Sequence, residues 1–277
     1  MVVWQCRSVC GGAGDRTKGL TSAFVDAARA GADFRVDWAN PVSITEVLEF
    51  RHPQLRLGDR PGNRLGSRRR FIQAIDRPYE SCAWRSPLAR GETVVVHTNM
   101  FATDRERCSG FPFPNGYADM AVVHDVFHFF FRPRPHIVPS PSHGCSLCVH
   151  ARLGDAAFRG ATNRESRVKD LILAIEPPDA TGCVYVATDS NLLRGMLAKH
   201  RKVRVEPQAP AHVDRGGGRA GLHSTWRSIL ALASCRTILQ LPGRSGFSNT
   251  AAAIGDNVTL CHGPCTGPRQ VAWIGGG

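Results

Sequence analysis

The stretch Cys148-Val-His150-Ala-Arg152-Leu-Gly154-Asp155 decides the fold assignment. Residues 146–152 predict a β-strand, and side chains alternate along a strand, so His150 and Arg152 share one face. Gly154 allows a sharp turn, and Asp155 follows in that turn. A strand that ends in arginine can hold a phosphate, because the guanidinium group donates two parallel N–H bonds. Taken alone, the stretch is explained equally well by a surface arginine and a core histidine.

Strands and helices alternate on both sides of this stretch. After it, the predicted helices are 164–175, 190–200, 224–235 (with Ser224 as N-cap) and 248–254, and the strands are 183–188, 203–206, 237–241 and 258–261. Before it, the predicted strands are 2–6, 33–38 and 93–98, the helices are 17–30 and 117–131, and residues 51–91 are irregular. Such alternation indicates parallel sheets that are covered by helices on both faces.

Composition changes at the proline-rich residues 132–144, which cannot continue a helix. We therefore predict an α/β protein of two Rossmann-like domains whose parallel sheets face a cleft. Their bounds are 1–135 for the N-terminal domain, 136–144 for the linker and 145–277 for the C-terminal domain. Ligands of open parallel sheets lie beyond the carboxyl ends of the strands, which is where we look for chemistry.

A second candidate site follows the predicted strand 237–241. The residues Ser245, Gly246, Phe247 and Ser248 lead into a helix that we expect to start near Ser248. The free N–H groups of a helix N-terminus attract anions, Gly246 permits close approach, and the serines add hydroxyl donors. An N-capped helix after a tight turn is the alternative explanation.

The glycine-rich loop after the first strand resembles half of a dinucleotide-binding fingerprint. Gly12 and Gly14 match G-x-G, and Asp37 lies where a ribose-binding acid would be expected. Thr17 stands where the third glycine or alanine belongs. An NAD(P)-binding oxidoreductase is therefore an alternative function.

A fourth candidate is Asp189, which follows the predicted strand 183–188. Its carboxylate could bind a base edge or a ribose, or it could cap the next helix.

Together, these segments resemble the superfamily of fucosyltransferases that use GDP-fucose. The family's H-x-R-x-G-D motif matches His150 to Asp155, its late serine loop matches residues 245–248 preceded by a helix with Trp226, and its strand-end acid matches Asp189. The resemblance implies a GT-B fold with two Rossmann-like domains. It also implies inverting transfer of fucose to a glycan or protein hydroxyl, with GDP-fucose as donor and without a metal or other cofactor.

The resemblance also assigns roles to residues. Arg152 would neutralise the departing diphosphate, since stabilising developing charge is usually the largest catalytic contribution. The donor nucleotide would be bound by His150, Arg152, Gly154, Asp155, Asp189, Ser245, Gly246, Phe247 and Ser248. The sugar and acceptor would face Gly12, Gly14, Asp15 and Arg16.

A general base for the acceptor hydroxyl is expected to be a carboxylate. Three aspartates, Asp15, Asp37 and Asp125, are candidates; we take Asp15 as the catalytic residue beside Arg152, although the sequence does not rank the three. A pseudoenzyme that binds the nucleotide sugar without transferring it is also compatible with the sequence.

The chain has 277 residues, a net charge of +12 and ten cysteines. A basic surface favours anionic partners, but no long Lys/Arg block supports nucleic acid. Cysteines at this density suit either disulfides or buried thiols. The pair Cys145 and Cys148 has the spacing of zinc ligands, so a zinc-stabilised nucleic-acid binder is a further alternative.

The sequence begins without the pattern of a signal peptide and has no apolar run of membrane-spanning length. The resemblance implies the Golgi or secretory lumen, with membrane attachment only through an anchor that these residues lack.

Overall fold

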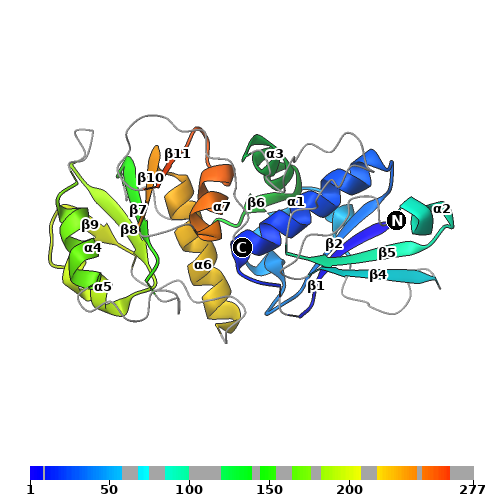
Figure 1. The fold of residues 1–277 in the computed structure, drawn as a ribbon, viewed down its shortest axis with the longest axis horizontal. Coiled ribbons are helices and arrows are strands. Elements are labelled where there is room, and N and C mark those ends of the chain that lie inside the picture. The colour runs from blue at the N-terminus through cyan, green and yellow to red at the C-terminus, as the bar shows by residue number, and fades with distance from the viewer. Residues whose placement is uncertain are drawn as a thin grey trace. The chain divides into compact units, whose positions relative to one another are not determined.

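The computed structural model describes residues 1–8, 10–57, 68–74, 85–99, 120–138, 144–153, 164–175, 182–206, 217–241 and 245–262. The chain divides into two compact units (Figure 1). The first comprises Met1–Arg134, and the second begins at Pro135. Each unit is built on its own parallel sheet.

The sheet of the first unit has four parallel strands in the order β2-β1-β5-β4. Its strands are β1 (Val2–Cys6), β2 (Phe34–Trp38), β4 (Arg69–Ala74) and β5 (Thr93–Thr98). Its helices are α1 (Ala13–Arg29), α2 (Arg85–Ala89) and α3 (Met120–Phe130), with short 3₁₀ turns at Ile44–Glu46 and Pro53–Leu55. A separate antiparallel pair joins β3 (Leu48–Phe50) to β6 (Phe131–Pro133).

The sheet of the second unit has five parallel strands in the order β11-β10-β7-β8-β9. Its strands are β7 (Leu147–Ala151), β8 (Val184–Thr188), β9 (Val203–Val205), β10 (Thr237–Leu241) and β11 (Thr259–His262). Its helices are α4 (Arg164–Leu173), α5 (Asn191–Leu197), α6 (Gly218–Ala233) and α7 (Gly246–Ile254). The predicted fold class, α/β with parallel sheets, is confirmed.

Alternation along β7 assigns its side chains to two different layers. Leu147, Val149 and Ala151 belong to an apolar cluster with residues of α4 and α5. The intervening residues, Cys148 and His150, point to the opposite face, where His150 meets α7. The second sheet is therefore covered by α4 and α5 on one face, while α7 covers the face that carries His150.

Three expectations about element boundaries were wrong. The segment 51–91 contains a strand, β4, which pairs with β5 as the edge of the first sheet. Helix α1 starts at Ala13 rather than at residue 17. Helix α6 starts at Gly218, so Ser224 is not its N-cap; the Ser224 hydroxyl donates to the Gly221 carbonyl inside the helix at 3.1 Å.

The cysteines form disulfides within each unit. Cys6 is bonded to Cys10 in the first unit, and Cys145–Cys183 and Cys148–Cys235 are bonded in the second. Of the two alternatives that the sequence left open, disulfides rather than buried thiols describe these six residues.

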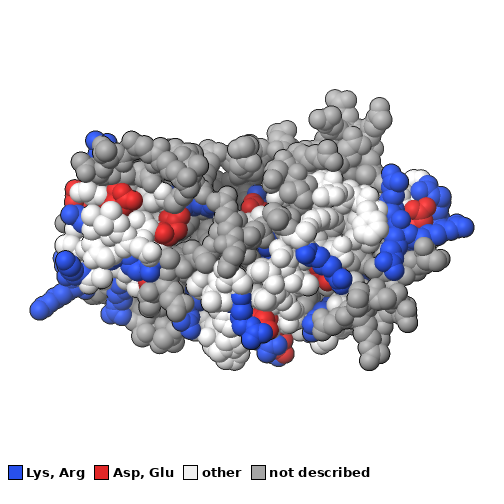
Figure 2. Space-filling model, turned by 90° about the horizontal axis from the view of Figure 1, so that it is seen from below, with Lys and Arg blue, Asp and Glu red and all other residues white. Residues whose placement is uncertain are grey.

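Basic side chains lie in separate groups on the face seen in Figure 2, with acidic side chains among several of them. The ion pairs of the first unit include Arg90 with Glu92 at 2.7 Å and Arg132 with Glu49 at 2.8 Å. The Arg132 guanidinium donates to both oxygens of Glu49, which lowers the pKa of that carboxyl. No helix within the described ranges has both the length and the apolar character needed to cross a bilayer.

A close helix–strand contact in the first unit requires glycine at position 19. A Cβ atom at Gly19 would lie 2.0 Å from the Thr98 carbonyl oxygen, and the Trp4 indole N–H donates to that same oxygen at 3.1 Å. Because Trp4 is fully buried, the oxygen cannot move aside cheaply.

We expect Gly19→Ala to lower the free energy of unfolding by about 1–3 kcal/mol, the usual cost of overpacking a filled interior. The matched control is Gly195→Ala in α5, where a Cβ meets nothing within 4 Å and alanine should raise stability by up to about 1 kcal/mol. Denaturant unfolding measures both, and a Gly19→Ala protein as stable as the control would contradict the packing argument.

Candidate functional site

The best-defined polar site lies at the carboxyl end of β7, where His150 is 3% exposed. Its Nδ1 atom is 2.5 Å from the Ser248 hydroxyl oxygen, and its ring stacks on Phe247 with centroids 4.8 Å apart. Both contacts come from the first turn of α7. The sequence candidates His150, Phe247 and Ser248 therefore form one cluster.

Burial lowers the pKa of His150 to about 3, and the positive charge of Arg152 contributes to this shift. The imidazole is therefore neutral at physiological pH and has one N–H donor and one acceptor nitrogen. Since Nδ1 is engaged by Ser248, the Nε2 atom is the one suited to bind a ligand.

The N-terminus of α7 differs from the expected one. The helix starts at Gly246, and Ser245 is its N-cap, with a hydroxyl oxygen that accepts from the Phe247 amide at 3.3 Å. Ser248 lies inside the first turn, where it bonds to His150 instead of capping. This end of the helix still presents free N–H groups and the positive end of the helix dipole.

Arg152 directly follows β7 and lies beside this helix end. Its backbone N–H donates to the Leu241 carbonyl at 3.1 Å, which joins the last residues of β7 and β10. The carboxyl ends of β7 and β10 are thus neighbours, and α7 is the next helix after β10 in the chain. The other two members of the motif, Gly154 and Asp155, lie outside the described residues.

Asp189 holds the turn after β7. Its Oδ1 atom accepts from the Leu153 amide at 2.7 Å, so the carboxylate connects the ends of β7 and β8. The cap of α5 is Ser190 rather than Asp189, because the Ser190 hydroxyl accepts from the Leu193 amide. Asp189 therefore supports the loop that carries Arg152.

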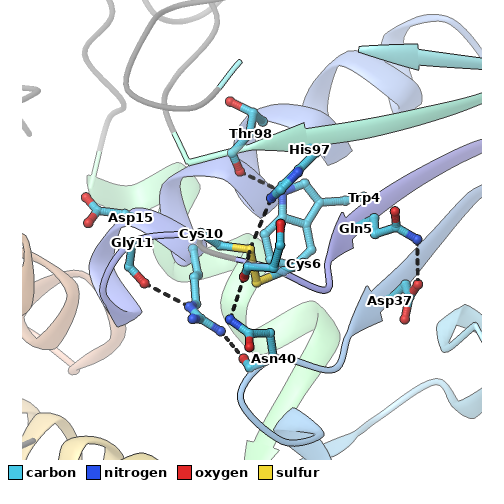
Figure 3. Close-up of a disulfide and its surroundings, with 12 residues drawn as sticks. Trp4, Gln5, Cys6, Cys10, Gly11, Asp15, Asp37, Asn40, His97 and Thr98 are labelled. Carbon is cyan, nitrogen blue, oxygen red and sulfur yellow. Dashed lines mark hydrogen bonds between the residues drawn. A yellow bond between two sulfur atoms is a disulfide. The ribbon is translucent and has the colours of Figure 1, made fainter. Parts of the chain in front are cut away.

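In the first unit, the glycine-rich loop is closed by the disulfide between Cys6 and Cys10 (Figure 3). The His97 Nε2 atom lies 3.3 Å from the sulfur of Cys10. The Asn40 amide donates to the Ser8 carbonyl at 2.5 Å. Sequence reasoning did not single out Asn40 or His97; the available signal was that both are polar residues at or just after a strand end.

Arg16, expected on the sugar side, is fully buried beneath this loop. Its guanidinium group donates to the carbonyls of Gly11 (3.0 Å) and Asn40 and lies 5.8 Å from the centre of the Trp38 ring. These contacts show that Arg16 fastens α1 to the loop that follows β1 and to the turn that follows β2.

Asp15 and Gly12 form the start of α1. Gly12 is the N-cap, and its amide donates to Asp15 Oδ2 at 3.0 Å. Asp15 Oδ1 lies 2.8 Å from the Lys18 ammonium, and 37% of the Asp15 side chain remains exposed. Gly14 lies within the helix rather than in the loop.

The structure brings the candidates together in two groups. One group is on β7, its following turn and α7, and the other is on the β1–α1 loop. Of the base candidates, Asp37 is buried and accepts from Gln5 at 2.8 Å and Arg7 at 2.5 Å, whereas Asp125 is exposed on α3.

Solved structures with a similar fold include fucosyltransferases. Fucosyltransferase NodZ from Bradyrhizobium aligns over 96% of both chains with a TM-score of 0.57 and 18% identity. NodZ alpha-1,6-fucosyltransferase co-crystallised with GDP gives 0.56 over 92% of both chains at 19% identity. A mutant of Arabidopsis thaliana FUT1 in complex with GDP gives 0.58 over 94% of this chain and 69% of that one, at 13% identity.

The chain has the fold of these fucosyltransferases. No family model and no curated protein matches its sequence. The recognition from short motifs and the GT-B-like fold expected from it agree with these structural neighbours.

Two alternative functions lose their structural basis in this fucosyltransferase fold. The dinucleotide fingerprint is incomplete, because Thr17 stands at its third glycine position, and the Asp37 carboxylate is held by Gln5 and Arg7. The predicted zinc site is wrong as well, because Cys145 and Cys148 belong to two different disulfides. Within the described ranges, no three His, Cys, Asp or Glu residues are grouped to hold a metal ion.

The depressed pKa of His150 predicts a specific pH dependence. Between about pH 6.5 and pH 3 the unfolded chain binds a proton at this residue and the folded chain does not, so stability falls as the pH falls. His150 contributes at most one proton to the pH dependence, which is about 1.4 kcal/mol of the free energy of unfolding per pH unit. We expect His150→Gln to lose this contribution.

Denaturant unfolding of both proteins from pH 7 to pH 4 measures the slope. An NMR titration of the His150 ring in the wild-type protein is a second readout that needs no variant. A ring that titrates with a midpoint near the ordinary histidine value, about 6.5, would contradict the buried neutral imidazole.

Proposed function

We propose that this protein is a glycosyltransferase that transfers fucose from GDP-fucose to a hydroxyl of a glycan or protein. The observation that carries the proposal is that His150, Arg152 and the N-terminus of α7 come together at the carboxyl end of β7. The fold adds support, because NodZ, which shares it, has been crystallised with GDP and soaked with GDP-fucose.

The donor diphosphate would lie at the start of α7. The free amides of the first turn and the Ser245 hydroxyl proton would bind its oxygens, and the Arg152 guanidinium would neutralise the charge that develops as GDP leaves. His150 would use Nε2 toward the nucleotide. Gly246 would allow close approach, Phe247 would hold the imidazole, and Asp189, with Gly154 and Asp155 of the motif, would shape the turn and contact the nucleoside.

Transfer would be a single displacement with inversion. The bond between the anomeric carbon and the phosphate oxygen breaks, the electron pair leaves with GDP, and the acceptor oxygen bonds to the opposite face of the carbon. The acceptor proton passes to a carboxylate. Since arginine and the helix end supply positive charge, we propose that transfer needs no metal or other cofactor.

The acceptor side is assigned to the β1–α1 loop with Gly12, Gly14, Asp15 and Arg16. Arg16 would act by fixing the loop, because it is buried. Asp15 would be the base, because its carboxylate is partly exposed and already positioned by Gly12 and Lys18. Disulfides in both units favour an oxidising compartment such as the secretory lumen or Golgi.

Arg152→Ala tests the donor site by calorimetric titration with GDP and GDP-fucose in EDTA. Losing a charge-assisted bond to phosphate should weaken binding by about 1.5–3 kcal/mol, or roughly 10- to 150-fold. Arg236→Ala is the matched control, because it removes the same charge from the opposite end of β10 and should leave binding unchanged.

ADP, UDP and NAD are the competing ligands in this titration. Selective binding of NAD, or equal affinities in wild type and Arg152→Ala, would contradict the proposal. Tight GDP binding without transfer to any acceptor tested would assign the site to a pseudoenzyme.

Asp15→Asn separates catalysis from helix capping at the first turn of α1. The amide keeps an oxygen for the Gly12 N–H but loses the ion pair with the buried Lys18, so the melting temperature should fall. Transfer, compared at a temperature where both proteins are folded, should fall by about 10²–10⁴-fold, the usual contribution of a general base. Unchanged transfer in Asp15→Asn would limit Asp15 to capping and make Asp37 or Asp125 the next candidate.

A further inference from the structure

Helix α3 of the first unit carries two histidines one turn apart. His124 and His128 are both half-buried, and their ring centroids lie 4.3 Å apart with an interplanar angle of 50°. Residues four apart in a helix share one face, and here the two rings have turned toward each other. Neither histidine belongs to the proposed donor site or to the β1–α1 loop.

Two imidazoles in this relation have the chemistry of a metal clamp. Imidazole is the commonest protein ligand for first-row divalent cations. A His-x-x-x-His pair on one helix face supplies two ligands in zinc proteases. A Zn–N bond is roughly 2.0–2.1 Å long, so one ion can bridge two rings whose centres are 4.3 Å apart.

The surroundings of the pair also favour a cation. His128 lies in the last turn of α3, where the carbonyl end of the helix dipole is negative. The exposed Asp125 is three residues before His128, and so its carboxylate adds negative potential on the neighbouring part of the helix surface.

We propose that His124 and His128 bind a divalent transition cation such as Zn²⁺, Cu²⁺ or Ni²⁺, with water completing its coordination. Nitrogen ligands select these ions over Mg²⁺ and Ca²⁺, which prefer oxygen. The proposal stands independently of fucose transfer, because neither His124 nor His128 is assigned a role in that reaction.

Binding there would stabilise the first unit. The helix places Val126, Phe127 and Phe130 in the core, and its Phe129 and Phe130 rings pack on Phe24 of α1 at 5.3 and 4.8 Å. An ion that joins the last two turns of α3 binds the folded chain better than the unfolded one, and so raises the melting temperature by mass action.

The test uses the full chain after treatment with EDTA and desalting, titrated calorimetrically with ZnCl₂ and then with NiCl₂ at neutral pH. We compare wild type with His124→Asn and His128→Asn; His200→Asn, which changes a half-buried histidine of the second unit, is the matched control. We expect one ion per chain in wild type and control, at least about tenfold weaker binding in either test variant, and a Zn²⁺-dependent rise in melting temperature that both test variants lose.

The EPR spectrum of the Cu²⁺ complex reports the nitrogen ligands directly. It would not change if His124 and His128 had only a structural role. It should show two nitrogen ligands in wild type and one in each test variant. Equal affinities in all four proteins, or a loss in His200→Asn as large as in the test variants, would overturn the proposal, as would a Cu²⁺ spectrum that the substitutions leave unchanged.

Discussion

The buried hydrogen bond between His150 Nδ1 and the Ser248 hydroxyl is the interaction on which the second unit's site depends. It connects the carboxyl end of β7 to the first turn of α7, and Phe247 from the same turn stacks on the imidazole. The adjacent Arg152 amide ties β7 to the last residue of β10. A neutral histidine, a helix N-terminus and an arginine are thereby held at the carboxyl end of β7. An anionic diphosphate fits that combination.

The first unit fixes its strand-end loop by different means. A buried guanidinium group, that of Arg16, satisfies carbonyls from the loop and from the end of β2, and the disulfide between Cys6 and Cys10 closes the loop itself. Burying a charged group in this way costs free energy unless it is paired, so the carbonyls and the Trp38 ring are part of the same arrangement. Both oxygens of Asp15 have partners, the Gly12 amide and the Lys18 ammonium, and 37% of its side chain remains exposed.

Much of the sheet architecture could be predicted from the sequence. Runs such as Val94-Val95-Val96 are β-branched and buried, and β-branched residues are enriched in strands. The edge strand β4 escaped prediction because its first residues, Arg69, Arg70 and Phe71, are exposed and show no buried pattern. The starts of α1 and α6 were misplaced because their N-caps, Gly12 and Gly217, have no side chain to recognise.

The sequence places the candidate residues near strand ends but does not show which partners they contact. The positions of His150, Arg152, Ser245 and Ser248 follow from strand ends, whereas the contact of His150 with Ser248 joins residues 98 apart and depends on the order of strands in the sheet. Likewise, the spacing of Cys145 and Cys148 suggested a shared metal, because the sequence does not show that Cys183 and Cys235 lie beside them.

The most direct test of this account is a crystal structure of the protein with GDP bound. We expect the diphosphate within hydrogen-bonding distance of the Gly246 amide and the Ser245 hydroxyl, with the Arg152 guanidinium on the same phosphates. A diphosphate bound instead at the β1–α1 loop beside Gly12 would contradict the assignment of the donor site to the second unit.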